Sequence, residues 1–234
     1  MRSYTIDFLT FEWGRNLSIT IFFIFLFLLI GSYLNKKNRL TLGKSISLFL
    51  LITIVLSHIE NFLTNQWTTK EHLPLHLCSI NALLCTILLF IPRNKILFEF
   101  VFYGGVLGGL VALLTPQIND YDGSLFEYLI YYTNHGIIIL FPLFLYYLLD
   151  FKLTKLSWLR TLIILNILMV IFMPLNSLLG SNYMYVNRPP NVKNPLIIGE
   201  WPYYLVNLEI IILILFLITY WLFTKVLIMK SKQI

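Results

Sequence analysis

A thiol and an imidazole stand out among the residues that could do chemistry, because both lie within long apolar segments. Cys78 belongs to the stretch Leu73–Asn81, and His135 lies in the apolar segment 125–149. Polar groups in such segments cost free energy unless they are paired or face a cavity. An imidazole can take the proton of a thiol, which can then attack an acyl ester and hold the acyl group as a thioester. From spacing alone, the commoner role of a buried cysteine, a small core residue, is favoured for Cys78 and still more for Cys85.

Further polar side chains in these segments could orient the imidazole or bind a substrate. An amide or imidazole group could donate hydrogen bonds to an oxyanion, and a carboxylate could fix the tautomer of a histidine. Each can equally form a hydrogen bond between helices, as amides in membranes often do. The candidates for these supporting roles are His58, Glu60, His76, Asn81, Asn134, Asn207 and Glu209.

A metal site is an alternative interpretation of the histidines. His72 and His76 are four residues apart and would share a helix face. With His58, His135 or Glu209 they could form an intramembrane zinc site that activates water for hydrolysis. The spacing lacks an HExxH motif, so the pattern favours a surface position for His72 and a hydrogen-bonded His76 over metal ligation.

The elements that must position these groups are membrane-spanning helices. The chain is 58% hydrophobic and 12% charged, and its mean hydropathy is +0.79, which excludes an ordinary soluble domain. The composition predicts an all-α membrane protein, a single domain over residues 1–234 with one bundle of seven helices. The expected spans are 17–34, 45–62, 73–91, 96–114, 125–149, 158–178 and 203–227. Four glycines in the fourth span, Gly104, Gly105, Gly108 and Gly109, predict close helix packing.

The charged residues predict the orientation of the bundle. Twelve of the 17 basic residues fall in alternate loops and the tail, including Lys36, Lys37 and Arg93. By the positive-inside rule the amino terminus lies outside and the carboxyl terminus in the cytoplasm. Helical rise then places Cys78 about 8 Å and His135 about 15 Å below the outer surface. The supporting polar groups fall in the same outer half. The clusters of basic residues mark orientation, so no nucleic-acid surface is expected.

Several motifs resemble those of the YwaF-type bacterial integral membrane proteins, which are similar to the eukaryotic transmembrane protein 164 family. The motifs are Leu73–Cys78, the triplet Asn134–Gly136, the loop segment Asn182–Tyr185, and Gly199–Tyr204 at the last helix entry. The eukaryotic relatives are described as phospholipid acyltransferases that use a membrane cysteine and a histidine. By position, the resemblance implies Cys78 as nucleophile and His135 as general base.

The function expected from the resemblance is acyl transfer between membrane phospholipids, with no cofactor, in the plasma membrane of a bacterium. Two alternatives from other classes remain open at this point. One is a transporter or receptor whose polar cluster binds a small molecule, although no internal repeat of the kind found in many transporters is present. The other is the zinc-dependent lipid hydrolase described above.

Overall fold

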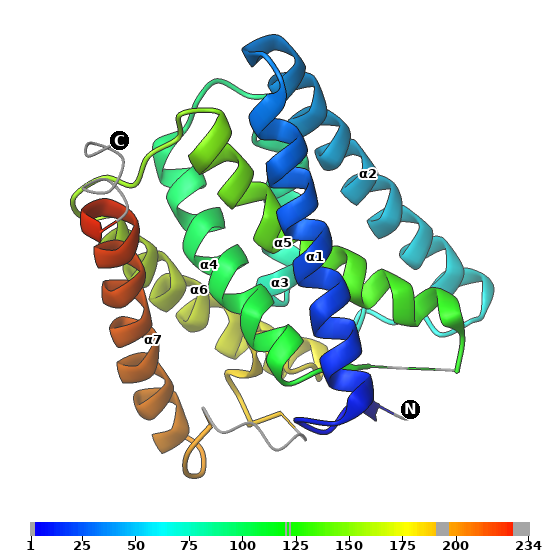
Figure 1. Cartoon of the computed structure of the whole chain (residues 1–234). Helices are drawn as coiled ribbons and strands as arrows, with labels where there is room; N and C mark the ends of the chain where they lie inside the picture. The colour runs from blue at the N-terminus through cyan, green and yellow to red at the C-terminus, as the bar shows by residue number, and fades with distance from the viewer. Residues whose placement is uncertain (1–2, 120, 122, 191–196, 227–234) are drawn as a thin grey trace. The chain divides into compact units, whose positions relative to one another are not determined.

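The computed structural model describes residues 3–119, 121, 123–190 and 197–226. Over these residues the chain is an all-α membrane protein with seven α-helices (Figure 1), as the sequence predicts. Within the described residues, six helices are long and apolar enough to cross a membrane. They are α1 (Phe11–Tyr33), α2 (Lys36–Leu63), α4 (Lys95–Leu114), α5 (Leu125–Leu148), α6 (Ser157–Leu179) and α7 (Tyr203–Trp221), the last continued by a π-helical turn, η2 (Leu222–Val226).

The predicted orientation rests in part on residues outside the described ones. These are Asp120, Asp122, Lys193, Lys230 and Lys232, and the expected end of the last span, Leu227, lies outside them too. Which face of the membrane holds each terminus stays a prediction.

The described residues form two compact units. The first contains the residues up to Trp67 and the segment Leu77–Phe151, and so holds α1, α2, α4, α5 and the short helix α3 (Leu77–Ile87). The second contains Thr68–His76 and the chain from Lys152 onward, with α6 and α7.

The third predicted span is helical over a shorter stretch than the sequence predicts. The prediction was one helix over residues 73–91, whereas α3 covers Leu77–Ile87 only. Pro74 has no backbone N–H, and its ring disfavours helical geometry at Leu73, so the helix begins after this pair. Eleven residues give a helix of about 16 Å, roughly half the thickness of a hydrocarbon core. The amino end of α3 is therefore a helix terminus within an apolar segment.

Side-chain caps set where the long helices of the first unit begin. In each case an oxygen of the residue before the helix accepts a hydrogen bond from a backbone N–H of the first turn, which satisfies one of the donors left without a partner there. The caps are Thr10 for α1, Asn35 for α2, Asn94 for α4 and Ser124 for α5.

The close packing predicted from the glycines of α4 is present against α5. A Cβ added at Gly105 would lie 2.5 Å from the carbonyl oxygen of Ile138, and one added at Gly109 would lie 2.6 Å from Cγ1 of Ile139. Neither contact could be made without a shift of the neighbour. Only glycine therefore lets the two helices approach this closely.

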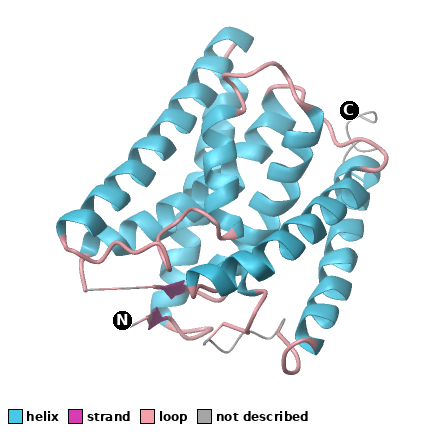
Figure 2. Cartoon of the chain, turned by 180° about the vertical axis from the view of Figure 1, so that it is seen from behind, coloured by secondary structure: helices cyan, strands magenta, loops and turns pink. Residues whose placement is uncertain are grey.

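A short antiparallel ribbon, not predicted from the sequence, joins the amino-terminal segment to the chain after α4. Strand β1 (Tyr4–Thr5) pairs with β2 (Gln117–Ile118), and Tyr4 lies opposite Ile118 (Figure 2). Beside it, the indole Nε1 of Trp13 donates to the carbonyl of Leu114 at 3.0 Å. These contacts fix the beginning of α1 to the end of α4.

In the second unit, Asn176 near the end of α6 organises the following loop. Its Nδ2 donates to the carbonyl of Tyr183 at 3.0 Å, and its Oδ1 accepts from the backbone N–H of Tyr183 and the hydroxyl of Ser181, both at 2.8 Å. Tyr183 begins the 3₁₀ turn η1 (Tyr183–Tyr185), and its hydroxyl donates to the carbonyl of Thr69 and accepts from the N–H of Leu73. The loop thus holds the segment Thr68–His76.

Candidate active site

Cys78 lies in the first turn of α3 and packs against the glycine-rich face of α4. It is the second residue of the helix and is half-buried, with a free thiol. A Cβ added at Gly108 would lie 3.8 Å from Sγ of Cys78. The first four N–H groups of an α-helix have no acceptor within the helix, and that end of the helix dipole favours negative charge. A thiolate or an oxyanion formed at Cys78 would therefore be stabilised by its own helix.

His135 lies on α5 and meets α4 at the neighbouring glycine. A Cβ added at Gly109 would lie 3.1 Å from the carbonyl oxygen of His135. The Nδ1 of His135 is 2.7 Å from the carbonyl oxygen of Tyr131, and the two rings are 4.3 Å apart between centroids. Because a carbonyl oxygen can only accept, Nδ1 carries the proton and donates. In the neutral ring, Nε2 then has the lone pair that a general base needs.

Hydrogen bonds from α2 indicate independently that Cys78 and His135 lie at the same height along the helix axes of the first unit. The hydroxyl of Ser47 donates to the carbonyl of Cys85 at 3.0 Å, and the hydroxyl of Thr53 donates to Oδ1 of Asn134 at 2.7 Å.

With the rise per residue of a helix, these two hydrogen bonds give the positions of Cys78 and Asn134 relative to one another along the axis of α2. Helices α2 and α3 are antiparallel, since Leu89, just after α3, lies beside Gly43 near the beginning of α2. From Ser47 to Thr53 is about 9 Å along α2, and from Cys85 back to Cys78 is about 10 Å along α3. Cys78 therefore lies level with Thr53, and so with Asn134 and its neighbour His135. The structure brings these two residues to adjacent glycines of α4 at the same depth.

Two of the supporting amides lie at this level, and their hydrogen bonds are made within one helix or between helices. Asn81 is fully buried, and its Nδ2 donates to the carbonyl of Leu77, which ties the first turn of α3 together. Its Oδ1 is buried without a hydrogen-bond partner within the described residues. Asn134 accepts from Thr53 and so joins α5 to α2. Both therefore hold the backbone that carries Cys78 and His135.

His58 and Glu60 lie further along α2, away from the pair. The Nδ1 of His58 accepts from the indole of Trp67 at 3.1 Å, near the end of the helix. His58 is about 8 Å and Glu60 about 10 Å beyond Thr53 along the helix axis. The structure does not bring these two side chains to the level of Cys78.

The remaining candidates belong to the second unit. His76 packs against the rings of Tyr183 and Tyr185, with 5.1 Å between centroids in both cases. Asn207 donates to the carbonyl of Ile198 at 2.8 Å. Glu209 accepts from Nδ2 of Asn166 at 2.6 Å, a hydrogen bond between α7 and α6 of the kind that the sequence left open.

The described part of neither unit gathers three His, Cys, Asp or Glu side chains that could hold a metal ion. In the second unit, Nδ1 of His72 accepts from the backbone N–H of Thr68 at 3.2 Å, and His76 faces the tyrosine rings.

Comparison with known proteins places the chain in a family. The model of the TMEM164 family matches residues 9–220, almost the whole chain. The chain belongs to the TMEM164 family. The matched region of this TMEM164 protein includes Cys78, His135 and every supporting candidate named above. No curated protein and no solved structure matches the chain.

Two residues of this site were not predicted from the sequence. They are Tyr131, whose carbonyl fixes the tautomer of His135, and Thr53, whose hydroxyl joins α2 to Asn134 of α5. Tyr131 precedes His135 by one helical turn, and this spacing is a signal that could have found it. Thr53 carries no such signal, because its partner is 81 residues away.

Proposed function

We propose that this member of the TMEM164 family is a multi-pass membrane enzyme that transfers fatty acyl chains between phospholipids through a thioester on Cys78. The observation that carries the proposal is the placement of Cys78 and His135 against Gly108 and Gly109 of one helix. The family match is consistent with an integral membrane protein whose substrates lie within the membrane. The membrane concerned is the plasma membrane of a bacterium.

The first half-reaction moves the acyl group to sulfur. The unprotonated Nε2 of His135 takes the proton of the Cys78 thiol as Sγ attacks the ester carbonyl of a phospholipid, and the oxygen of that carbonyl becomes an oxyanion. Collapse of this intermediate breaks the bond between the acyl carbon and the glycerol oxygen. The imidazolium of His135 returns its proton to that oxygen, and a lysophospholipid leaves.

The second half-reaction repeats these steps in reverse order with an acceptor. His135 takes a proton from the hydroxyl of a lysophospholipid, and its oxygen attacks the thioester carbonyl. The thiolate of Cys78 leaves and recovers the proton from His135. Water in place of the alcohol would give a free fatty acid, so exclusion of water from the first unit favours transfer over hydrolysis.

The oxyanion is stabilised by the amino end of α3 in this mechanism. The N–H groups of Cys78 and Ser79 are among those without an acceptor within the helix, and donors of this kind can lower an acyl-transfer barrier by about 3–4 kcal/mol each. Asn81 holds the carbonyl of Leu77 and so fixes the turn that presents them. Asn134, anchored by Thr53, fixes the turn of α5 that bears His135.

Transfer of a labelled acyl chain tests the proposal. Purified protein in nanodiscs would receive a phosphatidylcholine with one deuterated acyl chain and an unlabelled lysophospholipid. Mass spectrometry would then measure the two-chain lipid that forms when the lysophospholipid gains the deuterated acyl chain. We expect transfer by the native protein and by Cys85→Ser, and loss to background in Cys78→Ser and His135→Asn. Cys85 is the matched control because it is fully buried on the same helix. Transfer that persists in Cys78→Ser, or none by the native protein, would contradict the proposal.

A further inference from the structure

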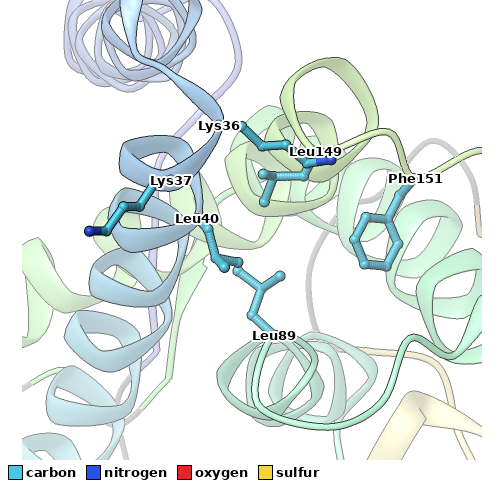
Figure 3. A pocket seen from close by; sticks show the side chains of 6 residues that line it. All are labelled: Lys36, Lys37, Leu40, Leu89, Leu149 and Phe151. Carbon is cyan, nitrogen blue, oxygen red and sulfur yellow. The ribbon is translucent and has the colours of Figure 1, made fainter.

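The first unit has a pocket at the end of α3 opposite Cys78. It has a volume of about 560 Å³ and is lined by Lys36, Lys37, Leu40, Leu89, Leu149 and Phe151 (Figure 3). This volume falls within the range of about 300–1,000 Å³ that ligand pockets occupy. Leu89 lies two residues after the end of α3, and Ile87, the last residue of the helix, is about 14 Å from Cys78 along its axis. The pocket is therefore separate from the candidate active site.

The pocket is lined almost entirely by apolar atoms, and the amine of Lys36 lies at one side of it. Figure 3 shows Leu40 and Leu89 pointing toward one another, while the Lys36 side chain extends toward Leu149 and the amine of Lys37 points away. Both lysines are exposed and occupy the first two positions of α2, where the backbone N–H groups and the helix dipole also favour an anion. An occupant that matches both the apolar lining and the amine has a negative group next to a hydrocarbon chain.

The neighbouring arginines are occupied by the protein itself. Arg39 donates to the carbonyls of Gly31 and Ser32 at 3.0 and 2.8 Å. Arg93 donates to the carbonyl of Leu149 at 3.1 Å, and its guanidinium lies 4.1 Å from the ring centroid of Phe151. Of the two lysines that line the pocket, Lys36 is therefore the cation that can meet a ligand there, because the amine of Lys37 points away.

We propose that this pocket binds one anionic phospholipid, with its phosphate at Lys36 and the upper part of an acyl chain against Leu40, Leu89 and Phe151. Charge complementarity selects an anionic lipid, because a basic group near a membrane surface attracts anionic headgroups. The apolar wall selects a lipid over free phosphate. The site is a lipid-binding site and takes no part in the chemistry of Cys78.

Native mass spectrometry tests this proposal with phosphatidylglycerol and phosphatidylcholine as the two probes. The native protein should retain one phosphatidylglycerol much more tightly than phosphatidylcholine. In Lys36→Gln the affinity for phosphatidylglycerol should fall by about 5-fold, from one lysine contact of ordinary strength. The control Lys95→Gln removes one exposed lysine outside the pocket and should keep the affinity.

A second pair of variants keeps the charge and changes the shape. Leu40→Trp should fill the pocket and lose phosphatidylglycerol, whereas Leu48→Trp, on the same helix but outside the pocket, should retain it. Equal binding of both lipids, unchanged affinity in the lysine variant, equal losses in a variant and its control, or displacement of the lipid by millimolar inorganic phosphate would each overturn the proposal.

Discussion

The contact of α4 with α5 predicts opposite effects on stability when alanine replaces two different glycines of α4. In Gly105→Ala the new Cβ would lie 2.5 Å from the carbonyl oxygen of Ile138, about 0.8 Å closer than carbon and carbonyl oxygen approach in stable contacts. The obstacle is backbone and cannot rotate away, so the helices must separate. In Gly108→Ala the new Cβ meets Sγ of Cys78 at 3.8 Å and Cδ2 of Leu77 at 4.0 Å, which are ordinary contacts.

The magnitudes follow from opposing effects. Alanine in place of glycine stabilises a helix by about 1 kcal/mol, and overpacking costs about 1–3 kcal/mol. The overpacking cost of Gly105→Ala should lie in the upper part of that range and exceed the gain in helix stability. We therefore expect a net destabilisation of about 1–2 kcal/mol, which is a fall in Tm of roughly 2–8 °C. Gly108→Ala should be as stable as the native protein or more stable by up to about 1 kcal/mol.

Thermal unfolding in detergent micelles, followed by tryptophan fluorescence, compares the two variants directly. Ile138 lies one turn after His135, so a shift of about 1 Å in Gly105→Ala should also lower acyl transfer by up to about 10²-fold. A Gly105→Ala protein as stable as Gly108→Ala would refute the close packing of α4 against α5.

Three further changes test other parts of the structure. Thr53→Val removes the hydrogen bond to Asn134 and should destabilise the protein by about 1–3 kcal/mol, seen in thermal unfolding, while a neutral result would contradict the link between α2 and α5. Asn176→Ala leaves several buried groups without partners and should cost about 2–4 kcal/mol and speed proteolysis of its loop; unchanged proteolysis would contradict its role. The hydrogen bond to Glu12 and burial raise the pKa of Tyr4 to about 12. The stability from this contact is present below pH 10 and lost as the pH rises toward 12, so the Tm difference between the native protein and Tyr4→Phe should vanish there.

The sequence predicted the helices well because long apolar segments and basic loops are local signals. It overextended the third span, because apolar composition continues from Leu73 to Ile91 while Pro74 ends helical geometry locally.

The sequence predicted which residue types form the candidate site better than it predicted how those residues are arranged in space. The pairing of Cys78 with His135 came from their chemistry and from the family resemblance, and neither depends on helix order. His58 and Glu60 were grouped with them by depth alone, and the structure places them nearer the end of α2. Contacts such as Thr53 with Asn134 join distant segments, so no local pattern could reveal them.

Direct detection of an acyl group on Cys78 tests the central claim. Intact-protein mass spectrometry would be performed on the native protein, Cys78→Ser and Cys85→Ser after incubation with mixed phospholipids in nanodiscs. The thioester mechanism predicts a fatty-acyl mass increment in the native protein and in Cys85→Ser. Hydroxylamine should remove it, and Cys78→Ser should lack it. An increment that survives in Cys78→Ser, or no increment together with unchanged lipids, would contradict the mechanism.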